Sequence, residues 1–137
     1  GMPVPVDYFT GIKTCTDSTA TGCIISWRTF KSRSKEPEYI ANENFKSIVI
    51  NPLSWTIKTD LVSSKYNLGG VLKNFKRVVP NVVNAQIHNN ILWSGKPDIP
   101  GKFLYVRKNY HIGDINLFYI NIRKNVEQRI NTYLDKD

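Results

Sequence analysis

The sequence holds few residues that bind metals or carry redox chemistry. It has two cysteines, Cys15 and Cys23, and two histidines, His88 and His111. Neither pair has the close spacing of the usual zinc ligands, and the histidines lie far from the cysteines along the chain. We therefore expect no metal site and no cofactor.

Long apolar runs, internal repeats and low-complexity tracts are also missing. No apolar run approaches the roughly 20 residues that a membrane-spanning helix needs, so we expect no transmembrane segment. The chain has 137 residues, of which 41% are hydrophobic and 22% charged. This size and composition are typical of one globular unit, and we expect a single domain over residues 1–137.

Acidic residues are scarce relative to basic ones. The chain has 19 lysines and arginines against 11 aspartates and glutamates, which gives a formal net charge of +8. The basic residues are spread over several loops, and no aromatic–basic signature of an RNA-binding sheet is present. We expect a solvated basic surface and no nucleic-acid partner. Attraction to an anionic substrate, glycan, lipid headgroup or partner chain is the alternative.

The two cysteines flank a polar loop, residues 16–22. A disulfide closing so short a loop is geometrically possible, and it would stabilise the fold by roughly 2–3 kcal/mol. Two reduced thiols are an equally good interpretation, because composition does not fix the redox compartment. A bridged pair would favour a periplasmic or extracellular location.

The pattern of apolar residues predicts short strands and a long helix. We expect strands at residues 23–27, 45–50 and 103–108, and a hairpin of residues 82–87 and 91–93 closed at residues 88–90. The middle of the chain, residues 56–80, reads as irregular, with a turn at residues 67–70. A C-terminal helix follows Asp114, because one apolar stripe recurs there at steps of four residues: Phe118, Ile122, Val126, Ile130 and Leu134.

His111 lies in a short loop between the expected strand 103–108 and this helix. Asp114 reads as the N-cap of the helix, since its carboxylate could accept the first unpaired N–H groups. A loop histidine placed in this way could act as a general base, with a carboxylate holding its other ring nitrogen. The carboxylates available are Asp60, Asp98 and Asp114.

No nucleophile matches this histidine. The sequence contains no Gly-x-Ser-x-Gly, and Ser26, Ser54 and Ser94 lack the glycines that a strained nucleophile elbow requires. The residues therefore indicate the histidine of a hydrolytic site without its serine nucleophile. A loop histidine bonded to nearby backbone is the plainer interpretation of His111.

Several motifs in order along the chain resemble a known family. They are GCIISWRTF at 22–30, NPLSW at 51–55, NLGG at 67–70, VNAQ at 83–86 and NYHIGDINLF at 109–118. Together they resemble the C-terminal half of a bacterial family of uncharacterised α/β-hydrolase-like proteins, described as esterase- or lysophospholipase-like. The resemblance covers nearly the whole chain.

The resemblance implies a fold and a function. The expected fold class is α/β, with a partial α/β-hydrolase-like sheet, an irregular, loop-rich middle and the long C-terminal amphipathic helix. His111 falls where the catalytic histidine belongs. In α/β-hydrolases the acid precedes the histidine along the chain, and Asp98 is the expected acid.

The family's longer members carry the nucleophile elbow upstream of the part that this chain resembles. The expected function is therefore the C-terminal portion of a serine ester hydrolase that acts on a small-molecule or lipid ester and is inactive alone. We also expect a homo-oligomer, or pairing with a missing N-terminal half. A non-catalytic binding module with a basic surface is the alternative.

Overall fold

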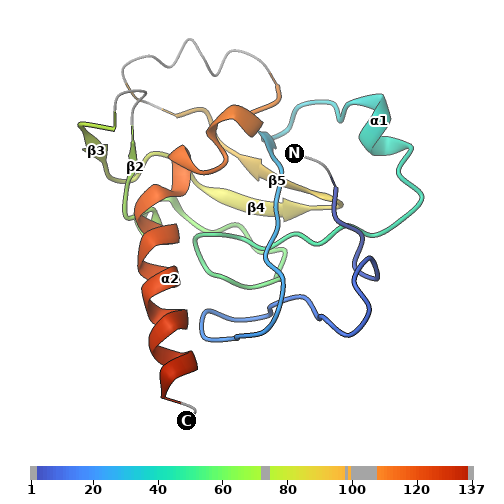
Figure 1. Cartoon of the computed structure of the whole chain (residues 1–137). Helices are drawn as coiled ribbons and strands as arrows, with labels where there is room; N and C mark the ends of the chain where they lie inside the picture. The colour runs from blue at the N-terminus through green and yellow to red at the C-terminus, as the bar shows by residue number, and fades with distance from the viewer. Residues whose placement is uncertain (1–2, 72–74, 98, 100–107, 136–137) are drawn as a thin grey trace.

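The computed structural model describes residues 3–71, 75–97, 99 and 108–135. Helix and strand are mixed, with two small sheets and one long helix at the C-terminus. Figure 1 shows the long helix, α2 (Tyr119–Leu134), standing along one side of the molecule, while the short α1 (Glu38–Ala41) lies on the opposite side. The coarse α/β expectation thus agrees with the structure.

The larger sheet has the order β1 (Thr29–Lys31), β5 (Ile91–Ser94), β4 (Ala85–His88). Strands β4 and β5 form the predicted hairpin, and β1 pairs in parallel with β5. The two-residue loop contains Asn89, whose φ of 50° lies in the left-handed region that asparagine tolerates. His88 pairs with Ile91 at the end of the ladder, so it belongs to β4 and not to the turn.

A smaller antiparallel sheet pairs β2 (Gly70–Val71) with β3 (Val78–Val79). It follows the predicted turn at residues 67–70. Gly70 allows a close approach here, because a Cβ on Gly70 would lie 2.8 Å from the carbonyl oxygen of Asn116. The described residues also form three 3-10 turns: η1 (Ser64–Tyr66), η3 (His111–Gly113) and η4 (Asn116–Phe118).

Two predicted strands are absent. Residues 23–27 and 45–50 carry isolated bridges and single hydrogen bonds in place of a ladder. The N–H of Ile48 donates to Val4, whereas that of Ile50 donates to Ser26, so the partner changes within two residues. Ile48, Val49 and Ile50 are nonetheless buried, and Ile24, Ile25 and Trp27 are partly buried against the core, which explains the strand-like pattern. Most of the strand predicted at 103–108 lies outside the described residues.

Both edges of the larger sheet have neighbours. Beside β1, Lys31 N–H donates to Lys108 and Tyr110 N–H donates to Thr29. Beside β4, Ala85 exchanges two backbone hydrogen bonds with Val62. These contacts make the described part of the sheet a poor template for edge pairing with another chain.

The main core lies between the larger sheet and the start of α2. Its buried members come from segments throughout the described chain: Val49, Leu53, Val82, Val83, Ala85, Ile87, Leu92, Ile99, Tyr110, Leu117 and Phe118. Trp27 packs edge-to-face on both Trp55 and Phe118, at ring-centroid distances of 6.2 and 6.4 Å. The tryptophans here are therefore packing residues.

The C-terminal helix differs from its prediction in two ways. It begins at Tyr119, because η3 and η4 occupy the residues just before it. The predicted apolar stripe is buried only at its start: Phe118 is fully buried, whereas Val126 and Ile130 are each 52% exposed. The physical reason is that the helix turns a polar face towards the body of the protein, through Asn121 and Asn125.

Candidate functional site

Backbone contacts fix the loop that carries His111. The Tyr110 N–H donates to the Thr29 carbonyl at 2.9 Å, which ties the loop to β1. The side chain of Asn109 then accepts the His111 N–H at 2.8 Å, and the Gly113 N–H donates to Tyr110 to close the turn. Tyr110 is fully buried, so it anchors the loop in the core and leaves His111 at the surface.

The carboxylate of Asp114 lies behind this histidine. One oxygen, Oδ1, accepts the backbone N–H of Thr29 at 2.8 Å, and the other, Oδ2, lies 2.7 Å from Nδ1 of His111. The Asp114 side chain is only 11% exposed. Two short hydrogen bonds therefore hold a nearly buried carboxylate in one orientation.

The N-cap prediction for Asp114 is wrong. The long helix begins five residues later, and Phe118 occupies its N-cap position. Both Asp114 oxygens are engaged by Thr29 and His111, and Thr29 is 85 residues away along the chain. Local capping rules could not reveal a bond to so distant a partner.

This arrangement fixes the tautomer of His111. An ionised carboxylate only accepts hydrogen bonds, so Nδ1 carries the proton in the pair. The other ring nitrogen, Nε2, then has a free lone pair when the ring is neutral. The His111 side chain is 51% exposed, and within the described ranges no hydrogen bond to Nε2 is recorded. A neutral imidazole in this state can accept a proton from a neighbouring group.

The expected acid, Asp98, lies outside the described residues. Asp60 is exposed, and no contact between it and His111 is recorded. Asp114 is the carboxylate that the structure does bring to His111. The sequence signal that could have identified it is the three-residue spacing from His111 to Asp114 within one tight turn.

The candidate serines do not meet this histidine in the described structure. The Ser94 hydroxyl donates to the Asn84 carbonyl, and the Ser54 hydroxyl bonds to that of Thr56. Asn51, which follows the buried residues 47–50, donates from its amide to the Ala85 carbonyl. These side chains have structural partners.

His88 also has a structural setting. Its ring stacks on Trp93 with a centroid distance of 3.6 Å, and its Nε2 lies 3.4 Å from the Glu36 carboxylate. Among the described residues, no group of three His, Cys, Asp or Glu side chains could hold a metal ion.

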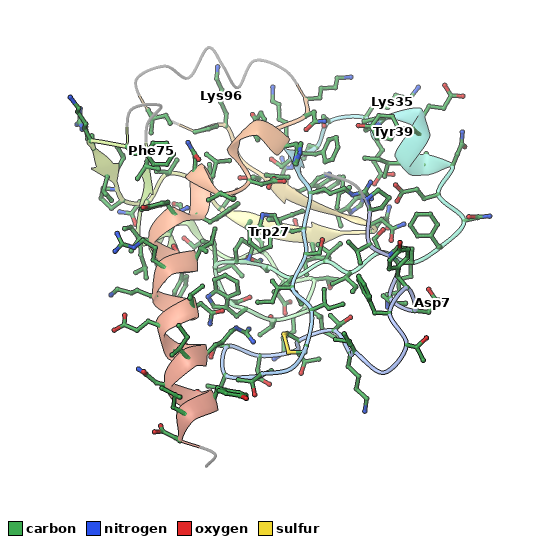
Figure 2. All side chains as sticks on the ribbon, in the orientation of Figure 1. Asp7, Trp27, Lys35, Tyr39, Phe75 and Lys96 are labelled. Carbon is green, nitrogen blue, oxygen red and sulfur yellow. A yellow bond between two sulfur atoms is a disulfide. The ribbon has the colours of Figure 1, made fainter. Side chains whose placement is uncertain are left out.

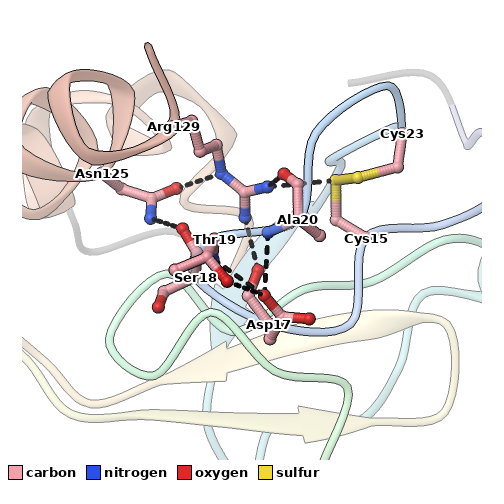
Figure 3. Close-up of a disulfide and its surroundings, with 8 residues drawn as sticks. All are labelled: Cys15, Asp17, Ser18, Thr19, Ala20, Cys23, Asn125 and Arg129. Carbon is pink, nitrogen blue, oxygen red and sulfur yellow. Dashed lines mark hydrogen bonds between the residues drawn. A yellow bond between two sulfur atoms is a disulfide. The ribbon is translucent and has the colours of Figure 1, made fainter. Parts of the chain in front are cut away.

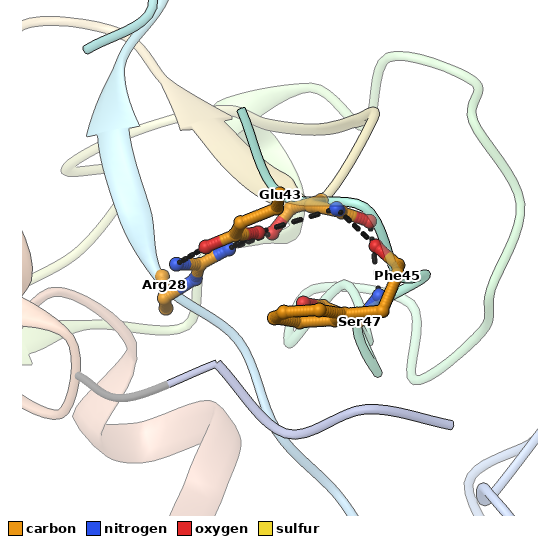
Figure 4. A network of polar contacts seen from close by, with 5 residues as sticks. Arg28, Glu43, Phe45 and Ser47 are labelled. Carbon is orange, nitrogen blue, oxygen red and sulfur yellow. Dashed lines mark hydrogen bonds and ion pairs between the residues drawn. The ribbon is translucent and has the colours of Figure 1, made fainter. Parts of the chain in front are cut away.

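A second buried polar cluster surrounds Arg28. Its guanidinium forms two 2.7 Å hydrogen bonds with the Glu43 carboxylate and a third, 3.0 Å long, to the Asn90 carbonyl (Figure 4). The side chain of Asn90 connects Glu43 to the backbone of Phe45 and Ser47. Because its partners are largely satisfied within the protein, this cluster serves to join the hairpin turn to residues 43–47.

Cys15 and Cys23 form a disulfide, and the loop that it closes is bound to α2 (Figure 3). Arg129 donates to the carbonyls of Asp17 and Ala20, and Asn125 donates to the carbonyl of Ser18. Burial lowers the pKa of Arg129 from its ordinary value, while nearby Asp17 opposes that shift. The bridge resolves the alternatives left open by the sequence, and it is compatible with an oxidising compartment.

No helix among the described residues is long and apolar enough to cross a membrane. Comparisons of the chain with models of protein families, with curated proteins and with solved structures find no match.

Proposed function

We propose that this chain provides the histidine and carboxylate of a serine ester hydrolase site, as the C-terminal portion of an α/β-hydrolase-like enzyme. The observation that supports it best is the 2.7 Å contact between His111 Nδ1 and Asp114 Oδ2. A buried carboxylate that orients an exposed histidine is the arrangement by which hydrolytic triads activate a serine. Asp114 replaces Asp98 as the proposed acid.

Each residue has a definite role in this proposal. His111 Nε2 takes the proton of a serine hydroxyl as the oxygen attacks an ester carbonyl, and later returns it to the leaving alcohol. Asp114 stabilises the imidazolium that forms between these two steps. In this proposal another part of the complete enzyme supplies the serine and the oxyanion donors, because this chain has no Gly-x-Ser-x-Gly.

The order of these residues departs from the α/β-hydrolase pattern. Asp114 follows His111 by three positions, whereas the acid of that fold precedes its histidine. The proposal therefore depends on geometry, since recurring triads are defined by the roles of their side chains and not by their order. The substrate class we propose is a small-molecule or lipid ester. The Cys15–Cys23 disulfide favours a site of action outside the reducing cytosol.

The tautomer of His111 gives a direct test on the 137-residue chain. We expect its ¹⁵N NMR spectrum above the titration range of histidine to show Nδ1 protonated and Nε2 unprotonated. Asp114→Asn should remove this preference, while Asp98→Asn should leave it unchanged. A spectrum unaltered by Asp114→Asn would contradict the role of the carboxylate.

The hydrolase proposal itself needs a chain that carries a nucleophile. In a longer homologous chain with a Gly-x-Ser-x-Gly elbow, alanine at the position equivalent to His111 should reduce kcat for aryl esters by several orders of magnitude. Asparagine at the position equivalent to Asp114 should reduce it by about 10⁴. Near-normal turnover in the alanine variant would exclude His111 from the mechanism.

The 137-residue chain is the matched control for that experiment. We expect a fluorophosphonate probe to label the longer chain at its elbow serine and to leave this chain unlabelled, because a histidine without a nucleophile cannot form the covalent adduct. Stoichiometric labelling of this chain would show that it holds a serine nucleophile that the structure and motifs do not reveal.

A further inference from the structure

The outward side of α2 carries exposed apolar residues among charged ones, although the helix buries polar residues. Asn121 and Asn125 are 5% and 3% exposed, whereas Leu134 is 61% exposed. Asn121 donates to the Tyr66 carbonyl and accepts the Leu68 N–H. Asn125 donates to the Ser18 carbonyl and accepts from the Arg129 guanidinium. We define the outer face of α2 by its apolar residues Tyr119, Val126, Ile130, Tyr133 and Leu134.

This face is continuous with the β2–β3 hairpin. Phe75, 57% exposed, packs edge-to-face on Tyr119 with ring centroids 6.0 Å apart. Arg123 lies over the same tyrosine ring, 5.6 Å from its centre. Figure 2 shows Phe75 beside the upper end of α2, on the side of the molecule where the hairpin lies. Aromatic and aliphatic side chains thus extend from the hairpin to the end of the helix.

The surface is hollowed on both sides of the apolar residues. A shallow groove of about 580 Å³ runs along α2, bordered by Val126, Ile130 and the basic pair Arg123 and Lys124. A second, of about 330 Å³, separates the helix from the disulfide loop beside Tyr133. Isolated exposed apolar residues are common, but several of them gathered on one side of a helix mark an interaction site.

Charge identifies the kind of partner. Arg123 and Lys124 border the outer face, and exposed Arg77 lies in the adjoining hairpin. Two acidic residues lie near them: Glu127 in the groove, and exposed Asp135 directly after Leu134. With a formal net charge of +8, two copies of the chain repel each other, whereas an anionic surface attracts each of them.

We propose that the outer face of α2 docks on an anionic lipid surface, with the helix lying in the plane of the headgroups. A helix that has an apolar face bordered by basic residues binds membranes in this way. The apolar side chains would enter the boundary of the acyl chains, while Arg123 and Lys124 reach the phosphates through their long stems. This inference is independent of the proposed hydrolase role of His111.

The test is sedimentation of the chain with vesicles of phosphatidylcholine alone or of phosphatidylcholine and phosphatidylglycerol at 3:1. We expect binding to the anionic vesicles that weakens as salt is added. Val126→Ser/Ile130→Ser should weaken it about tenfold or more, since each substitution removes apolar burial. Arg123→Gln/Lys124→Gln should weaken it about fivefold for each charge removed.

Matched variants control for exposure and for charge. Ile57→Ser/Leu61→Ser removes apolar residues of similar exposure, 51% and 61%, away from α2. Lys35→Gln/Lys46→Gln removes the same charge from exposed positions elsewhere. Both should bind about as the parent chain does, and circular dichroism should confirm that every variant is folded.

Three outcomes would overturn the proposal. The parent chain could fail to bind anionic vesicles, or the control variants could weaken binding as much as those on α2. Alternatively, the chain could fail to bind vesicles and form a dimer that Val126→Ser/Ile130→Ser dissociates. A second copy of the chain would then cover this face. His111→Ala should leave vesicle binding unchanged, which separates this proposal from the hydrolase proposal.

Discussion

Glu43 and Arg28 form the most completely buried ion pair of the described residues. Their side chains are 8% and 5% exposed, and two short hydrogen bonds join them. A buried pair of this kind adds little over an apolar replacement, but a single partner left behind is costly because its charge is then unpaired.

We therefore expect Glu43→Ala to lower the free energy of unfolding by about 3–5 kcal/mol. Urea denaturation followed by circular dichroism measures this loss. The double variant Arg28→Met/Glu43→Leu removes both charges together and should recover much of the stability. A loss below about 1 kcal/mol for Glu43→Ala would mean that solvent reaches Arg28.

Asp17 makes the stability of the disulfide loop depend on pH in the acid range. The Thr19 N–H, the Thr19 hydroxyl and the Ala20 N–H all donate to its carboxylate. Chiefly the bond from the Thr19 N–H lowers the pKa of Asp17 below its ordinary value of 3.8. The folded state therefore favours the ionised form more than the unfolded state does.

The sign of the effect follows from linkage. The contribution of Asp17 to stability is fully present above pH 3.8 and is lost as pH falls through the lower, folded-state pKa. Asp17→Asn keeps an acceptor oxygen but cannot titrate. The difference in melting temperature between the parent chain and this variant should shrink below pH 3.8. A constant difference for Asp17→Asn would contradict the assignment.

At the scale of elements, the disulfide loop and α2 act as one assembly. The bridge joins residues separated by eight positions, and Arg129 of α2 bonds the backbone within the loop. The loop thus covers the polar side of the helix that would otherwise face solvent. Without the bridge, the unfolded chain has more conformational entropy. In the folded state, the carbonyl groups that bind Arg129 are then no longer held in place by the disulfide.

We expect Cys15→Ser/Cys23→Ser to lower the free energy of unfolding by about 2–3 kcal/mol, from the loop-closure entropy alone. Equilibrium denaturation measures the change. Thiol titration of the denatured, unreduced parent protein should find no free cysteine. Two titratable thiols would contradict the bridge and remove its support for an oxidising compartment.

At the scale of the whole molecule, distant segments depend on one another. Asn125 of α2 bonds Ser18, 107 residues away, and Asp114 bonds the backbone of Thr29, 85 residues away. The larger sheet also combines β1 with strands from residues 85–94. These contacts join segments that are far apart in the sequence.

We therefore expect a single cooperative unfolding transition, as a one-domain chain should show. Circular dichroism at 222 nm reports mainly on the 16-residue α2, and tryptophan fluorescence reports on Trp27, Trp55 and Trp93 in the body of the protein. The two signals should give the same midpoint in urea. Loss of the helical signal at a lower concentration would show that α2 unfolds separately.

Local rules in the sequence determined several elements correctly. Alternating apolar residues and the asparagines after them placed the hairpin of β4 and β5, and the four-residue apolar period placed most of α2. The short spacing of Cys15 and Cys23 made the disulfide one of two possibilities. Each of these features depends on residues within a few positions of one another, where φ preferences and periodicity are decisive.

Only the tertiary structure decided which surfaces meet. It placed the Asp114 carboxylate against His111 and Thr29 and not at a helix terminus, and it left residues 47–50 buried with an isolated bridge and no strand ladder. It also turned Asn121 and Asn125 of α2 inwards, because carbonyl groups of distant loops accept hydrogen bonds from their amides. Apolar side chains at these positions would leave the carbonyl groups without those bonds. These contacts join residues 55 to 107 positions apart, and the local pattern of a helix or a loop does not identify such distant partners.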